Sequence, residues 1–181
     1  DLKMTIMGTV FGAVGTCGQR CTSTRRLIVH EDIYENVRNS LVKAYDQIKI
    51  GNPLDSNNHV GPLIDINAVE SYKDAISKVN NQGGSWLVKG GILEGEEYSS
   101  GCYVKPAIAE VNHSLEIVHQ ETFAPILYLI KYKGDVRNAI DIQNEVDQGL
   151  SSAIMTNNLK ESELFLSHWG SDCGIANVNI G

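Results

Sequence analysis

Two thiols in one short loop are the side chains of this chain most able to do covalent chemistry. Cys17 and Cys21 lie four residues apart in a glycine-containing segment, residues 15–23. This is not the two-residue spacing of a thioredoxin-like redox pair, and no histidine or second cysteine pair lies near enough in sequence to complete a zinc site. The five histidines show no ligand spacing. We therefore predict neither disulfide exchange nor a bound metal.

A nucleophilic role is the third possibility, and it suits Cys21. Such a cysteine needs partial exposure, a means of becoming a thiolate, and hydrogen-bond donors for the oxyanion that it generates. A loop between a helix and a strand provides exposure and free backbone N–H groups, and Arg20 places a positive charge beside the thiol. On these residues alone, a buried structural cysteine remains the alternative, because free cysteines often pack as small apolar side chains.

The flanking sequence predicts the elements that hold this loop. Apolar residues recur at helical spacing over residues 2–14 and stop at Gly15 and Gly18, which predicts a buried helix leading into the loop. An apolar run over residues 25–29 predicts a strand directly after it.

The remaining chain alternates between helical and strand-like patterns. A long helix is expected to be capped by Asp32 and to bury Ile33, Val37 and Leu41, while Pro106 suggests an edge strand or a bulge. Further helices are predicted over residues 67–80, 136–145 and 160–169, and strands over 85–88, 103–111, 123–132, 151–155 and 174–179. This alternation predicts a three-layer α/β/α sandwich with a largely parallel sheet, as one domain over residues 1–181.

Composition and charge argue against several classes of protein. With 181 residues, 42% of them hydrophobic and 20% charged, the chain has the make-up of a globular protein. A net charge of −7 with scattered basic residues argues against nucleic acid as a partner. No apolar stretch approaches the ~20 residues of a membrane span, and no secretory signal opens the chain. We expect a cytoplasmic location with free thiols, and a chain that is part of a longer protein.

Several short motifs together resemble one enzyme family. They are Gly18-Gln19-Arg20-Cys21, Gly51-Asn52-Pro53-Leu54-Asp55, Val60-Gly61-Pro62-Leu63-Ile64, Glu121-Thr122-Phe123-Ala124-Pro125-Ile126 and Gly149-Leu150-Ser151-Ser152. In this order and spacing, they resemble the catalytic domain of the aldehyde dehydrogenase superfamily over essentially the whole chain. Residues 21–26, 119–128 and 170–179 are most similar to its antiquitin branch, whose substrate class is an acid semialdehyde.

The resemblance implies a reaction and a cofactor. Cys21 matches the nucleophile that attacks the aldehyde, and its backbone N–H matches one of two oxyanion donors. Glu121 matches the carboxylate that binds the ribose of NAD, and Phe123 the aromatic residue beside the nicotinamide. A small-molecule aldehyde is the expected partner, and the full-length protein is expected to be a homo-oligomer. Another acid-semialdehyde dehydrogenase and a catalytically silent assembly domain are the alternatives.

Two further residues are assigned to the substrate. Arg20, next to the nucleophile, can hold a carboxylate with two parallel hydrogen bonds, so it favours substrates with a remote acid group. Asn177 belongs to the segment that the resemblance places beside the aldehyde channel, together with Asp172 and Asn179, for which turn and cap chemistry is the alternative. Cys17, Cys102 and Cys173 are interpreted as packing residues. The family's general base, in a Glu-Leu-Gly-Gly motif, and its second oxyanion donor, an asparagine, have no match in this chain.

Overall fold

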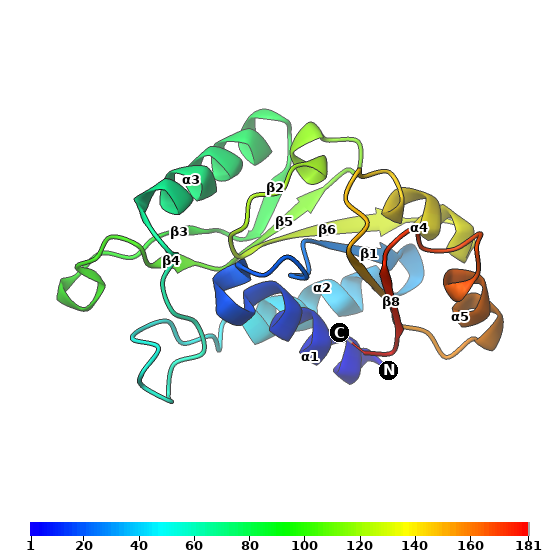
Figure 1. Cartoon of the computed structure of the whole chain (residues 1–181), viewed down its shortest axis with the longest axis horizontal. Helices are drawn as coiled ribbons and strands as arrows, with labels where there is room; N and C mark the ends of the chain where they lie inside the picture. Colours follow the sequence, from blue (N-terminus) through cyan, green and yellow to red (C-terminus); the bar gives the residue numbers. More distant parts are fainter. Residues whose placement is uncertain (181) are drawn as a thin grey trace.

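A four-stranded sheet forms the centre of the molecule, which a computed structural model describes over residues 1–180. Its strands run in the order β1 (Arg26–His30), β6 (Ile126–Tyr132), β5 (Ala107–Val111) and β2 (Ser85–Val88) (Figure 1). The pairs β1/β6 and β6/β5 are parallel, and only β2 is antiparallel to its neighbour. The predicted largely parallel sheet is confirmed.

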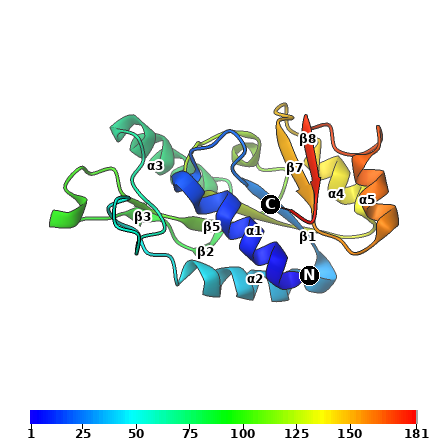
Figure 2. The same ribbon diagram turned by 60° about the horizontal axis from the view of Figure 1, so that its bottom comes forward.

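Helices cover both faces of this sheet. Adjacent residues of a strand point to opposite faces. On β5, Glu110 accepts a hydrogen bond from Tyr34 of α2 (Glu31–Tyr45), whereas Val111 points to the side where α3 (Ile66–Asn81) packs. Figures 1 and 2 show the sheet between these two helices, with α1 (Leu2–Val14) beside α2. The three-layer arrangement is therefore the predicted α/β/α sandwich.

The C-terminal part adds a smaller α/β unit next to β1. β7 (Ser151–Ile154) and β8 (Ile175–Val178) form a separate parallel pair (Figure 2). The remaining elements are α4 (Val136–Gln143), α5 (Leu159–Leu166), the two-stranded hairpin β3 (Gly91–Ile92) with β4 (Val104–Lys105), and the short 3₁₀ segments η1 (Gly15–Gly18), η2 (Glu96–Tyr98) and η3 (Glu116–His119).

The long helix α2 differs from its prediction in its cap and its buried face. It begins at Glu31, and its N-cap is His30, whose side chain accepts a hydrogen bond from the Asp32 N–H. Ile33 is exposed, and Tyr34 takes its place in the buried stripe with Val37, Leu41 and Tyr45. Tyr34 continues the spacing of three and four residues that places side chains on one helix face, so it faces the sheet.

The strand predicted over residues 103–111 is divided at Pro106 into β4 and β5. Proline has no N–H for a ladder hydrogen bond, so pairing is interrupted at this residue. The expectation of an edge strand was wrong, because β5 lies between β2 and β6 and is almost entirely buried.

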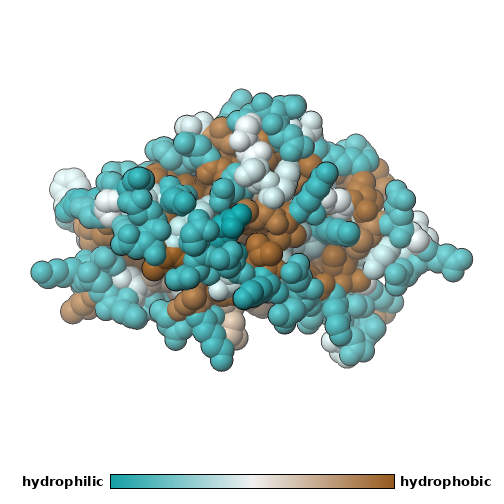
Figure 3. All heavy atoms as spheres, turned by 180° about the vertical axis from the view of Figure 1, so that it is seen from behind, coloured by the Kyte–Doolittle hydropathy of each residue, from teal (hydrophilic) through white to brown (hydrophobic). Residues whose placement is uncertain are grey.

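Helix α1 is mostly apolar and has Lys3 as its one charged residue, and its apolar residues are not confined to one face, unlike those of the amphipathic α2 and α3. Ala13 and Val14 are buried in the core, but Met4, Met7 and Phe11 are exposed, so only one side of the predicted buried helix is covered. Among residues 1–180, no helix has both the length and the apolar character to cross a bilayer. On the side of the molecule opposite to that of Figure 1, apolar residues form separate areas among polar ones (Figure 3).

We predict that the exposed side of α1 makes the isolated chain self-associate, since apolar patches on a protein surface tend to be interaction sites. The double variant Met4→Gln/Met7→Gln should lower the average mass measured by light scattering at high protein concentration. Leu54→Gln is the control, because Leu54 is 92% exposed but lies on a loop away from this helix. A monodisperse monomer without any substitution would contradict the prediction.

Candidate active site

One cavity of about 390 Å³ brings together four of the five residues that the sequence assigned to a site. Cys21 and Arg20 reach it from the loop after α1, Glu121 from the segment before β6, and Asn177 from β8. Phe123 is 40% exposed but does not line this cavity. Residues far apart in sequence therefore meet at one site, as the predicted chemistry requires.

The cysteine loop is fixed by a close backbone approach. Gly18 has a φ of 67°, and a side chain there would come within 2.5 Å of the Ala124 carbonyl. Only glycine combines this backbone conformation with such close packing. Thr16 and Cys17 also have positive φ values, 51° and 55°. The loop thus turns sharply at residues 16–18 and rests on the segment that carries Glu121.

Cys21 lies in a turn that leaves its backbone N–H free. The Ser23 N–H donates to the Arg20 carbonyl over 3.0 Å, and the Arg20 N–H donates to Ser23 Oγ over 3.1 Å. Cys21 and Thr22 are the central residues of this turn, and within residues 1–180 their N–H groups have no acceptor. The Cys21 side chain is exposed. The structure therefore offers a free thiol next to free N–H donors.

The other three cysteines lie in different surroundings. Cys17 is 1% exposed, and burial raises its pKa from an ordinary value of 9.0 to about 12, so this thiol stays protonated at neutral pH. Cys102 is buried as well, and Cys173 is partly exposed. None of the four forms a disulfide. The nucleophile needs the thiolate form, which Cys17 does not provide.

Arg20 lies across the end of α1. Its Nη2 donates to the Phe11 carbonyl over 3.1 Å, and its guanidinium stacks on the Phe11 ring at 4.9 Å from the centroid. Among the described residues, no carboxylate pairs with it. The side chain is held in place from one side and faces the cavity that contains Cys21.

Glu121 has a partner that sequence reasoning missed. Arg25, the residue before β1, pairs through Nη2 with Glu121 Oε1 at 3.0 Å, and its guanidinium lies 5.4 Å from the centroid of the Phe123 ring. The Glu121 side chain is 49% exposed, and Oε2 has no hydrogen-bond partner within residues 1–180. The available sequence signal was two consecutive arginines, Arg25 and Arg26, at the start of a strand.

Gln19 is a second residue that was missed. Its Oε1 accepts a hydrogen bond from the Ile64 N–H over 2.8 Å, and its Nε2 donates to the Pro62 carbonyl over 3.3 Å. One amide side chain thus ties the cysteine loop to residues 60–64, which explains in physical terms why these two motifs occur together.

The polar residues near the end of the chain separate into two roles. Asn179 exchanges hydrogen bonds with the backbone N–H and carbonyl of Thr156, so its side chain stabilises a turn. Asp172 is exposed on a loop and does not line the cavity, whereas Asn177 does. No group of three potential metal ligands occurs in the part of the chain that the structure describes.

The fold and the site define the class of protein. The sequence profile of the aldehyde dehydrogenase family matches residues 1–181, and the chain belongs to this family. The backbone agrees with that of a solved relative, 3,6-anhydro-L-galactose dehydrogenase in complex with NAP, with a TM-score of 0.95 and 28% identity over 100% of this chain and 38% of the relative.

Two curated relatives indicate the branch of the family to which the chain is most similar. The chain is 46% identical to aldehyde dehydrogenase family 7 member A1 of Pisum sativum, over 99% of this chain and 34% of the pea protein. It is 45% identical to alpha-aminoadipic semialdehyde dehydrogenase of Bos taurus, over 99% of this chain and 33% of the bovine protein. The chain thus spans about a third of the length of these relatives, and its similarity to the antiquitin branch is confirmed.

The buried Cys17 thiol predicts a loss of stability at high pH. Its pKa is raised on folding, so between pH 9 and 12 the unfolded chain loses a proton that the folded chain keeps. The free energy of unfolding should therefore fall by ~1.4 kcal/mol per pH unit through this thiol alone. Urea unfolding of Cys17→Ala between pH 9 and 11 should show a correspondingly shallower decline. Val14→Ala is the control, since it removes buried atoms but no titratable group. The prediction would be contradicted if the unfolding free energy declined with pH equally steeply for Cys17→Ala and for the unsubstituted chain.

Proposed function

We propose that this chain is the thiol-bearing part of an NAD-dependent dehydrogenase that oxidises an acid semialdehyde to the carboxylate. The observation that carries the proposal is the placement of Cys21: an exposed thiol on a turn with two free N–H groups, in the same cavity as Glu121. Membership in the aldehyde dehydrogenase family and the semialdehyde dehydrogenases among the relatives support it.

The chain's own groups account for the acyl chemistry. The Cys21 thiolate attacks the aldehyde carbon, and the oxyanion of the resulting thiohemiacetal is stabilised by the N–H of Cys21, which already lacks an acceptor in the structure. Loss of hydride leaves a thioester on Cys21, which water hydrolyses to release the acid and restore the thiol. A general base is needed to accept the proton of the Cys21 thiol and, later, to activate the water that hydrolyses the thioester. The motif that carries this base in the family has no match in these 181 residues.

The residues present fit a nicotinamide cofactor. When bound, the cofactor supplies the acceptor for the hydride. Glu121 can hold its ribose, because the unpaired Oε2 of an ionised carboxylate is a strong acceptor for hydroxyl groups. Phe123 offers an exposed ring next to this carboxylate. The relative 3,6-anhydro-L-galactose dehydrogenase was solved in complex with NAP, which supports a cofactor of this class here; NAD is the form that we propose.

The charge of the cavity favours an acidic substrate. Arg20, Arg25 and Arg26 line it, whereas Glu121 is its one acidic residue, although the whole chain has a net charge of −7. A local excess of positive charge attracts anions and raises their local concentration. Arg25 pairs with Glu121, and both terminal nitrogens of Arg26 donate to backbone carbonyls. Arg20 uses only Nη2, toward the Phe11 carbonyl, so it is the arginine with donors left for a substrate carboxylate. Asn177 faces the same space and is proposed as a second substrate contact.

We predict that Cys21 is the one cysteine whose loss abolishes turnover. Activity is measured after this chain replaces the matched segment of the pea relative, a chimaera called the full-length context below. Cys21→Ala should lower kcat by about 1,000-fold or more, while Cys17→Ala, Cys102→Ala and Cys173→Ala keep most activity. The isolated chain should be inactive, because general-base help contributes ~10²–10⁴ in rate. Turnover by Cys21→Ala would overturn the assignment of the nucleophile, and NADH formation by the isolated chain would contradict its expected inactivity.

The second prediction separates substrate binding by Arg20 from an influence on the thiol. In the full-length context, Arg20→Ala should raise KM for an acid semialdehyde and lower kcat/KM by ~10- to 100-fold, the loss of a charge-assisted pair of roughly 1.5–3 kcal/mol. Uncharged aldehydes of similar length should change little. Arg137→Ala, an exposed arginine on α4, is the control. Equal losses on charged and neutral aldehydes would assign Arg20 to the thiol instead.

A further inference from the structure

We propose that Arg25 is a positioning residue that clamps the turn carrying Cys21 to the carboxylate of Glu121, so that nucleophile and cofactor site keep a fixed relation. The proposal rests on the function given above for these two residues. Its basis is the set of contacts that one guanidinium makes with two segments almost a hundred residues apart in the sequence.

The anchor of this clamp is the central sheet. The Arg25 carbonyl accepts a hydrogen bond from the Tyr128 N–H of β6 over 2.8 Å, so its main chain is fixed directly before β1. The Arg25 side chain is only 19% exposed. Burial lowers the pKa of Arg25, and the negative charges of Glu121 and of an ionised Cys21 act against this shift. A cation held in such surroundings has little freedom to move.

On the nucleophile side, Arg25 holds both ends of the turn. Nη1 donates to the Ser23 carbonyl over 3.0 Å, and Nη2 donates to the Arg20 carbonyl over 3.2 Å. These two carbonyls bracket Cys21 and Thr22, the residues with free N–H groups. Hydrogen bonds from a charged donor are stronger than neutral ones, and the planar guanidinium fixes their directions.

On the cofactor side, the same guanidinium holds Glu121 and Phe123. Its Nη2 lies 3.0 Å from Glu121 Oε1, which leaves Oε2 free for a hydroxyl group. Phe123 has a φ of 56°, a conformation that is uncommon for a bulky residue and that surrounding contacts must maintain. The stacked Arg25 is such a contact. Without it, both side chains would lose their fixed position relative to the thiol.

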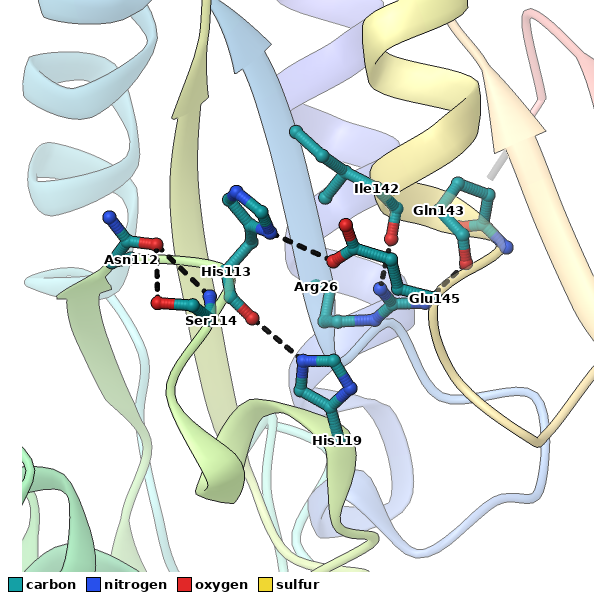
Figure 4. Close-up of polar contacts among 8 residues, drawn as sticks. All are labelled: Arg26, Asn112, His113, Ser114, His119, Ile142, Gln143 and Glu145. Atoms are coloured by element: carbon teal, nitrogen blue, oxygen red, sulfur yellow. Dashed lines mark hydrogen bonds and ion pairs between the residues drawn. The ribbon is translucent and has the colours of Figure 1, made fainter.

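The neighbouring Arg26 provides a matched control. It also donates to two backbone carbonyls, those of Ile142 and Gln143 at the end of α4, over 2.9 and 2.8 Å (Figure 4). Figure 4 shows Glu145 beside it. The Glu145 carboxylate is paired with His113, with Oε2 at 2.8 Å from Nδ1. Arg26 therefore has the same kind of backbone contacts as Arg25, but it contacts neither the cysteine turn nor Glu121.

The deciding experiment is a double-mutant cycle on KM for NAD in the full-length context. Arg25→Gln should raise this KM about 5- to 10-fold, whereas in a Glu121→Gln background the same change should raise it less than about 2-fold. Arg25→Lys, which keeps the charge beside Glu121, should restore KM to within about 3-fold. Arg26→Gln should lower the melting temperature and change KM less than about 2-fold, because Arg26 lines the cavity but donates only to the carbonyls of Ile142 and Gln143. An equal effect of Arg25→Gln in both backgrounds, or an equal effect of Arg26→Gln, would show a merely structural role and overturn the proposal.

A second readout needs neither cofactor nor turnover. In the isolated chain, Cys21 is alkylated with anionic iodoacetate and with neutral iodoacetamide. Arg25→Gln should lower the ratio of the two rates about 2- to 5-fold, because the cation next to the turn is lost. Arg25→Lys should leave the ratio nearly unchanged, and so should the control Arg137→Gln, because Arg137 is exposed and does not line the cavity. In the same chain, Arg25→Gln and Glu121→Gln should couple by about 2- to 5-fold in the unfolding equilibrium constant. Additive effects and an unchanged ratio would overturn the clamp.

The two readouts also separate this proposal from the proposed function. If Glu121→Gln leaves KM for NAD unchanged, the cofactor role of Glu121 is wrong, and the isolated-chain measurements alone decide the clamp. If Glu121→Gln raises KM but Arg25→Gln does not, the proposed function stands and the clamp fails.

Discussion

The arrangement of the site depends on the contact between the cysteine loop and the segment before β6. At Gly18 the two backbones approach so closely that no side chain fits between them. This contact allows Cys21, from the N-terminal part of the chain, to share a cavity with Glu121. Arg25 adds to this contact through Glu121, while Gln19 ties the same loop to a different segment, at residues 62 and 64.

The alternation of side chains along an extended chain explains how two adjacent arginines serve different parts of the molecule. Consecutive residues at the start of a strand point in opposite directions. Arg25 therefore reaches the cysteine turn and Glu121, while Arg26 reaches the end of α4. One arginine connects two parts of the site, and the other attaches the C-terminal unit to the central sheet.

Burial decides which of the two cysteines in the loop is available for chemistry. Cys17 and Cys21 occupy the same short loop, but the positive φ angles at residues 16–18 turn Cys17 into the core and leave Cys21 outside it. Burial raises the pKa of Cys17 and keeps it a neutral packing group. The exposed position next to free N–H groups leaves Cys21 as the thiol available for nucleophilic chemistry.

The sequence alone determined the order and type of the elements, because hydrophobic periodicity reports which faces are buried. This periodicity predicted the α/β/α sandwich, strand β6 and the helix before the cysteine loop. Its motifs also assigned Cys21 and Glu121 to a site, and both residues line the same cavity. Only the tertiary structure decided which residues from other segments each side chain contacts. The central place of β5 and the pairing of Arg25 with Glu121 depend on contacts between distant segments, about which local spacing carries no information. Likewise, the exposure of one side of α1 depends on what packs against it, not on its own apolar sequence.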